Sequence, residues 1–231
     1  MLLVFLLACQ PMAPVTTPSP APAVVAPEPT PDPYDVARRR LDDDRRALAL
    51  RPRSEARAAA RARLLEGIDD DLVPAWFGTP WAFYGTSTVP GQGEIACGYF
   101  VSTVLGHAGL QVERVRMAQQ PSEYIVKTFS PESELRRFRR KDAATVVRWV
   151  RSQPEGVYVV GLDYHVGMLV HREGEVRFCH SAFTTPNAVT CSDPHTDPGF
   201  VSSYRIVGPV LTDGVVDAWL DGEALPTYQP P

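Results

Sequence analysis

The sequence predicts an α+β fold in which helices come first and an antiparallel sheet follows. Three observations support this class. Apolar residues recur at helical spacing in the first part of the folded chain, and apolar runs of strand type begin only after residue 156. Two of these runs are joined by Glu173-Gly174, a tight-turn signal. Strands joined by so short a turn pair in the antiparallel direction.

The N-terminal end resembles a bacterial lipoprotein signal. Residues 1–9 form an apolar run that ends in Cys9, which would become the lipidated first residue. The run is too short to span a bilayer, which takes about 20 apolar residues. Residues 10–33 are rich in proline and nearly uncharged, so we expect a disordered tether. Together they predict a bacterial cell-envelope protein, lipid-anchored to a membrane and facing the periplasm or the exterior.

Residues 34–70 are expected to form a helical prelude of two helices, broken at Arg51-Pro52 because proline disfavours helical geometry in the residue before it. The second helix is rich in alanine and arginine, which favour helices. We interpret its arginines as a solvated face, with an anionic membrane surface as the alternative. The main domain is expected at 71–225, followed by a disordered tail at 226–231.

Within the main domain, residues 72–93 predict an aromatic loop. The elements expected after it are helices at 95–108, 121–129, 132–139, 142–152 and 215–220, and strands at 157–162, 165–171, 176–181 and 204–210.

The composition limits the partners. A formal net charge of −4 argues against nucleic acid. Of the four cysteines, Cys179 and Cys191 are spaced so that a hairpin or loop could bring them together. A disulfide is permitted outside the cytoplasm, although the sequence does not give the connectivity. We expect a monomer that uses no cofactor and no metal.

A cysteine and two histidines form the candidate catalytic set. Cys97 opens the helix at 95–108, and the turn at residues 173–174 places Gly167 opposite His180. His165 and His180 are then diagonal neighbours on one face of the sheet. A thiol near imidazoles suits nucleophilic catalysis of acyl transfer.

Each member of this set has an expected role. The helix N-terminus and a nearby imidazolium would lower the pKa of Cys97, the nucleophile. His165 would take and return the proton, and His180 would orient His165. The backbone N–H of Cys97 and a side-chain donor from the aromatic loop could hold the oxyanion. A zinc site is the alternative, but the paired-ligand spacing is missing.

The motifs at 97–101 (CGYFV), 116–120 (RMAQQ), 165–170 (HVGMLV) and 178–181 (FCHS) resemble those of NlpC-type cell-wall cysteine peptidases in order and approximate spacing. This resemblance implies a papain-like fold, with the cysteine-bearing helix packed on an antiparallel sheet of about four to six strands. It also implies Cys97 as nucleophile, His165 as base and His180 as third polar residue. The family's usual Asp-Cys-Ser-Gly core is replaced here by residues 96–99 (ACGY).

The resemblance also points to a substrate groove. The family's oxyanion tyrosine aligns best with Trp81, whose indole N–H can donate, and Tyr84 is the substitute candidate. Gln119 could line the groove or cap a turn. The implied activity is a cell-envelope cysteine hydrolase that cleaves an amide in peptidoglycan stem peptides through a thioester. The alternatives are a non-catalytic lipoprotein that binds cell wall or partner proteins, and a thiol acyltransferase acting on another amide.

Overall fold

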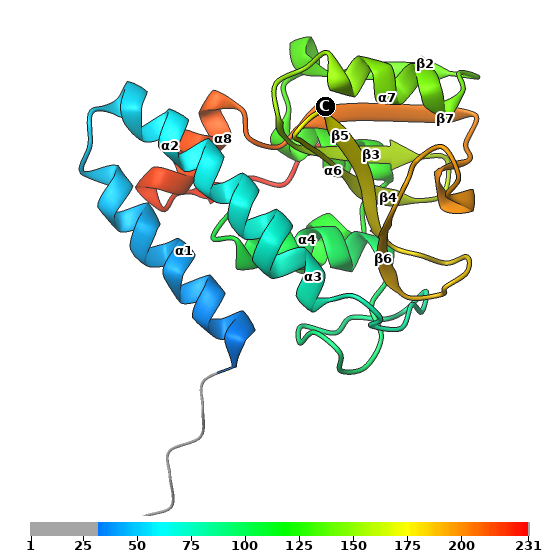
Figure 1. The fold of residues 1–231 in the computed structure, drawn as a ribbon, viewed down its shortest axis with the longest axis horizontal. Coiled ribbons are helices and arrows are strands. Elements are labelled where there is room, and N and C mark those ends of the chain that lie inside the picture. Colours follow the sequence, from blue (N-terminus) through cyan, green and yellow to red (C-terminus); the bar gives the residue numbers. More distant parts are fainter. Residues whose placement is uncertain (1–31, 231) are drawn as a thin grey trace, which may run out of the picture. The chain divides into compact units, whose positions relative to one another are not determined.

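The computed structural model describes residues 32–230, and its largest element is a six-stranded antiparallel sheet in the order β2-β7-β3-β4-β5-β6 (Figure 1). Its strands are β2 (Arg136–Arg139), β3 (Gly156–Leu162), β4 (Val166–Arg172), β5 (Glu175–Ser181), β6 (Val189–Ser192) and β7 (Tyr204–Pro209). Two short strands, β1 (Gln111–Val112) and β8 (Ala224–Leu225), pair in parallel apart from this sheet. The predicted α+β class is confirmed.

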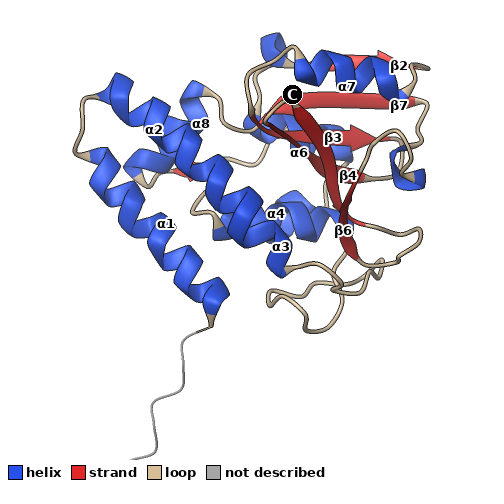
Figure 2. Ribbon diagram, in the orientation of Figure 1, coloured by secondary structure: helices blue, strands red, loops and turns tan. Residues whose placement is uncertain are grey.

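Helices surround the sheet and also form a layer beside it. They are α1 (Pro33–Ala49), α2 (Arg53–Glu66), α3 (Val73–Ala75), α4 (Cys97–His107), α5 (Arg114–Ala118), α6 (Ser122–Phe129), α7 (Ala143–Arg151) and α8 (Asp213–Asp221), with a π-helical turn at Gly67–Leu72. Figure 2 shows α1, α2 and α8 together on one side of the strands. None of the helices within residues 32–230 has the length and hydropathy that crossing a membrane requires.

The two faces of the sheet pack into two separate cores. Val157 and Val159 of β3 join the core of α1, α2, α4, α6 and α8, whereas Tyr158 and Val160 join the core beneath α7. This alternation follows from the period of two of a strand. Leu64 of the helical prelude is fully buried in the first core. The prelude therefore shares its core with the main domain.

The prelude arginines differ from the solvated face that the sequence suggested. Arg53, Arg57 and Arg61 of α2 pair with three aspartates spaced four residues apart on α8, namely Asp221, Asp217 and Asp213. The two helices run in opposite directions, so positions one turn apart on α2 meet positions one turn apart on α8. A single-sequence pattern could not show this partner, because α8 lies about 150 residues further along the chain.

Residues 132–139, expected as a helix, form a 3-10 turn at Glu132–Glu134 and then the edge strand β2. The arginines of this segment have high helix propensity, but Phe138 is buried in the second core and β2 pairs with β7. Charged side chains are common on edge strands, where one side faces solvent. Tertiary pairing overrides the local preference here.

Two ends of the prediction also change. The helical prelude continues through the π-helical turn and α3 to Ala75, inside the expected loop at 72–93. Thr227 is buried, and the backbone N–H of Tyr228 donates to Thr128 at 3.1 Å, so these residues belong to the folded unit rather than to a disordered tail. Cys9 and the predicted tether up to residue 31 lie outside the described residues.

Candidate active site

The strand register brings the two histidines together as the turn predicted. Glu173 and Gly174 both have positive φ, 55° and 76°, and Arg172 pairs with Glu175 across them. This is the geometry of a two-residue hairpin turn that matches the twist of the strands. Nε2 of His165 lies 2.7 Å from Nδ1 of His180, which confirms the predicted neighbourhood of the two rings.

A carboxylate that the sequence analysis missed extends this pair into a hydrogen-bonded series of His165, His180 and Asp197. Nε2 of His180 lies 3.0 Å from Oδ2 of Asp197, and Asp197 is almost fully buried. Burial by itself would raise the pKa of Asp197, but hydrogen bonds from His180 and Ser192 outweigh burial and lower it to about 2. Asp197 is therefore ionised at neutral pH and accepts the hydrogen bond from His180.

The charge of Asp197 sets the protonation along the series. Because the carboxylate only accepts, Nε2 of His180 carries the proton that faces it, and Nδ1, the remaining ring nitrogen, can accept. Nε2–H of His165 then donates to Nδ1 of His180, which leaves the lone pair of His165 on its own Nδ1. Burial, with a smaller contribution from His180, lowers the pKa of His165 to about 3. His165 is thus a neutral imidazole with a free basic nitrogen.

Packing holds this series in place. The ring of His180 stacks on Phe178 with 4.1 Å between centroids. A Cβ on Gly199 would lie 2.8 Å from Cε1 of His180, so only glycine fits there. Backbone N–H of Gly199 donates to the second oxygen of Asp197 at 2.7 Å. Rings locked in this way keep one orientation relative to the carboxylate.

The disulfide that the sequence allowed but did not assign is present and lies beside the series. Cys179 and Cys191 are bonded across β5 and β6. Cys179 directly precedes His180, and Cys191 directly precedes Ser192, whose hydroxyl donates to Asp197. The bond therefore fixes the strand of the second histidine to the strand that supports its carboxylate.

The cysteine reaches the series at the end of the sheet. Cys97 and His165 line one cavity of about 220 Å³. The other lining residues are Gly98, Ala118, Gln120, Pro121, Ser122, Ile125, Asp163, Tyr164 and Val166. Cys97 packs against the first core and His180 lies on the face of the second, so His165, which directly precedes β4, connects them. The structure thus brings the three sequence-predicted residues Cys97, His165 and His180 into one site.

The state of the thiol differs from the expectation. Burial raises the pKa of Cys97, and hydrogen bonding from the backbone of Val166, Gly98 and Cys97 itself offsets this only in part. Since His165 is neutral, it supplies no imidazolium charge to lower that pKa. Among residues 32–230 no hydrogen bond joins the thiol to His165, and such catalytic contacts often tighten only when substrate binds. The resting site is a neutral thiol beside a neutral base.

The backbone around Cys97 explains one departure from the NlpC-type motif. A Cβ on Gly98 would lie 2.3 Å from the carbonyl oxygen of Ala118, so a serine at this position would collide with α5. The N-cap residue Ala96 has no side chain that can bond the first N–H groups of α4. These N–H groups have no partner within the helix, and they are available to an oxyanion.

The three predicted groove residues do not line the cavity. Trp81 contacts Phe183, whose centroid lies 5.0 Å from that of His165. Tyr84 is 87 % exposed. Gln119 is exposed and donates to the hydroxyl of Tyr99 at 3.2 Å. The lining residues of the cavity include none of these three, whereas Gln120 is among them.

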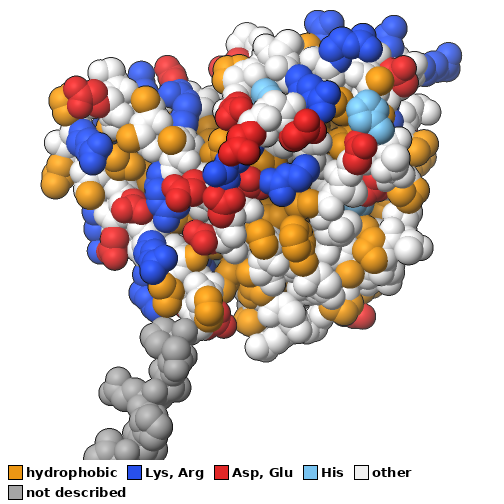
Figure 3. Space-filling model, in the orientation of Figure 1, with side chains coloured by type: hydrophobic (Ala, Val, Ile, Leu, Met, Phe, Trp, Pro, Cys, Tyr) orange, Lys and Arg blue, Asp and Glu red, His pale blue; other side chains and the backbone are white. Residues whose placement is uncertain are grey.

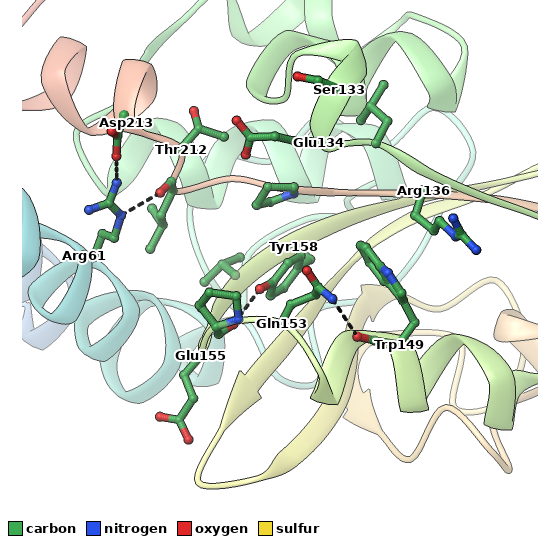
Figure 4. Close-up of a pocket in the computed structure, with 16 residues that line it drawn as sticks. Arg61, Ser133, Glu134, Arg136, Trp149, Gln153, Glu155, Tyr158, Thr212 and Asp213 are labelled. Carbon is green, nitrogen blue, oxygen red and sulfur yellow. Dashed lines mark hydrogen bonds and ion pairs between the residues drawn. The ribbon is translucent and has the colours of Figure 1, made fainter.

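A larger cavity of about 880 Å³ lies elsewhere, between α2, α7, α8 and the ends of β3 and β7 (Figure 4). Several of its polar groups are bonded within the protein. Arg61 pairs with Asp213 and donates to the carbonyl of Leu211, and the hydroxyl of Tyr158 donates to Pro154. Its lining residues include no cysteine and no histidine.

The described residues also bear on whether this chain could hold a metal ion. Within residues 32–230 no group of three or more His, Cys, Asp or Glu side chains is arranged to hold a metal ion. The ring nitrogens of His180 are both used, toward His165 and Asp197.

No family model, curated protein or solved structure matches this chain.

Proposed function

We propose that the protein is a cysteine hydrolase of the bacterial cell envelope that cleaves an amide, with peptidoglycan stem peptides as the substrate class. The observation that carries the proposal is the unbroken series Asp197, His180, His165, whose last member lines the same cavity as Cys97. The resemblance of four motifs to NlpC-type peptidases supports the substrate class and a papain-like arrangement of the helix and sheet.

The first half-reaction follows from these positions. Nδ1 of His165 takes the thiol proton as the sulfur attacks the carbonyl carbon, and a tetrahedral intermediate forms. Its oxyanion is held by the uncapped N–H groups at the start of α4. His165 returns the proton to the leaving amine, the C–N bond breaks, and an acyl thioester remains on Cys97.

The second half-reaction uses the same groups. His165 takes a proton from water, the hydroxide attacks the thioester, and the acid leaves as the thiol is regenerated. During both steps His165 carries a positive charge for a short time. His180 and ionised Asp197 stabilise this charge through the two hydrogen bonds, as the third group of a catalytic triad does.

Incubation with purified peptidoglycan tests the proposal. Wild-type protein should release muropeptides, and Cys97→Ala and His165→Gln should each lower the rate about 10³-fold or more. His195→Gln is the matched control, because His195 is an exposed histidine outside the site, and it should keep the wild-type rate. Release that persists in Cys97→Ala would exclude Cys97 as nucleophile.

A second measurement separates the enzyme from the non-catalytic alternative. Mass spectrometry of wild-type protein quenched in acid during turnover should show an acyl adduct on Cys97. Adding hydroxylamine should divert the adduct to a hydroxamate. If wild-type protein shows neither release nor adduct but still sediments with peptidoglycan, the binding function is favoured instead.

A further inference from the structure

Two uncharged stretches of the chain meet on the surface beside the candidate site. Residues 72–93 and 178–192 contain no Asp, Glu, Lys or Arg, although 22 % of the chain is charged. Backbone hydrogen bonds hold them together, from Gly78 to Val189 at 3.0 Å and from Trp81 to Asn187 at 3.0 Å. Neither stretch therefore contributes a charged side chain to the combined surface, and Arg114 reaches its edge from α5, where it donates to the carbonyls of Thr86 and Ser87 at 2.8 Å.

Large apolar side chains project from this surface. Its exposed members, which we call the neutral patch, are Phe77 (46 %), Phe83 (72 %), Tyr84 (87 %), Val89 (39 %) and Phe183 (43 %). Phe83 and Tyr84 are adjacent residues, and their rings touch edge to face at 4.9 Å. Side chains as exposed as these two contribute little to the core, so the fold alone does not explain them.

The charges of the molecule lie elsewhere. Figure 3 shows blue and red side chains gathered over the prelude and the upper part of the molecule, while the lower part, where the loops of the patch lie in Figure 1, is mostly orange and white. The start of α1 lies at the same end, because Trp76, the residue before the patch, donates to the hydroxyl of Tyr34 at 2.8 Å. The described part of the chain therefore begins next to the patch.

We propose that the neutral patch inserts into the interface of a lipid bilayer and brings the cavity of Cys97 close to the membrane surface. Aromatic side chains favour the boundary between headgroups and acyl chains. A protruding pair such as Phe83 and Tyr84 can enter it without desolvating a charge. The patch also reaches the site, since Phe183 contacts both Trp81 and His165.

Other partners fit less well. A glycan strand is usually bound in a hollow that combines an aromatic ring with carboxylates or amides. Tyr84 lines one such hollow with Gln92 and Glu94, but the exposed phenylalanines of the patch do not line it. Nucleic acid would need cations. The inference depends on neither the lipidation of Cys9 nor the enzymatic activity, so its test is independent of both.

Vesicle sedimentation tests it with residues 31–231, which form the compact unit and lack the predicted anchor. Wild-type protein should bind phosphatidylcholine vesicles. Phe83→Ser with Tyr84→Ser should lower the partition coefficient at least tenfold. Leu50→Ser is the matched control, an 89 % exposed leucine in the turn between α1 and α2, and should change it less than twofold. Adding phosphatidylglycerol should also change it less than twofold, because the patch carries no cation.

A second measurement does not depend on the double variant. Phosphatidylcholine brominated on its acyl chains should quench the tryptophan fluorescence of wild-type protein, and Trp81→Phe should remove most of this quenching. Absence of vesicle binding, binding only to anionic vesicles, or equal losses in Leu50→Ser and the double variant would overturn the proposal. Binding to cell-wall sacculi but not to vesicles, lost in the double variant, would assign the patch to glycan instead.

Discussion

The cavity between α2, α7 and β3 holds about 880 Å³, whereas the cavity of Cys97 and His165 holds about 220 Å³. In the larger one, Arg61 and Tyr158 already have partners within the protein, and the lining residues include no cysteine and no histidine. Cys97 and His165 line the smaller one together. Reactive groups held in position, rather than volume, therefore identify the candidate site.

The strongest test of this comparison is Asp197→Asn. Asparagine offers an amide N–H where the carboxylate only accepts, so Nε2 of His180 would no longer need to carry the proton. The tautomers of His180 and His165 would then reverse, and Nδ1 of His165 would be protonated. We expect kcat for muropeptide release to fall about 10²- to 10⁴-fold, with KM within about threefold.

The control for this substitution is Asp193→Asn, an exposed aspartate in the same loop, which should leave kcat unchanged. Because Asp197 acts through two rings, the pH profile is the second readout. The negative charge of Asp197 acts to raise the pKa of His165, so Asp197→Asn should move the acidic limb of the kcat–pH profile to lower pH. Retention of more than half the wild-type kcat in Asp197→Asn would mean that the carboxylate does not position the base.

The strand register could be predicted from the sequence, because two adjacent residues that tolerate positive φ specify a hairpin turn and the period of the strands does the rest. Asp197 could not. It lies in a loop whose path depends on a 3-10 turn at Pro198–Phe200 and on the close packing of Gly199 against His180. Only the proline and glycine that follow it signal a turn there, and they do not say what the turn faces.

The charge state of the Cys97 thiol is a second property that the sequence alone could not predict. A cysteine at a helix N-terminus is a local feature, and it predicts a low pKa. Burial is set by how α4, α5 and β4 pack together, and it acts on Cys97 in the opposite direction. A sequence motif can identify a nucleophile more readily than it can identify the charge state of that nucleophile.

The pH dependence of alkylation sharpens this point. Because the pKa of Cys97 is raised and that of His165 is lowered to about 3, the free protein should hold little thiolate at pH 6. The rate of Cys97 modification by iodoacetamide should rise about tenfold per pH unit between pH 6 and 8, with no plateau there. Measured by mass spectrometry of the Cys97 peptide, a rate that is constant below pH 7 would instead indicate a thiolate–imidazolium pair.

The smallest expected effect comes from substituting one exposed residue of each cavity. Tyr164 is 97 % exposed and lines the small cavity, and Ser133 is an exposed residue of the larger one. Tyr164→Ala removes a side chain that substrate would contact next to His165, so KM should rise about three- to tenfold, as for loss of part of an apolar contact. Ser133→Trp partly fills the larger cavity and should leave kcat/KM within twofold. If Ser133→Trp instead lowered kcat/KM more than Tyr164→Ala does, substrate would occupy the larger cavity, and the site would have to be extended across α7 to include it.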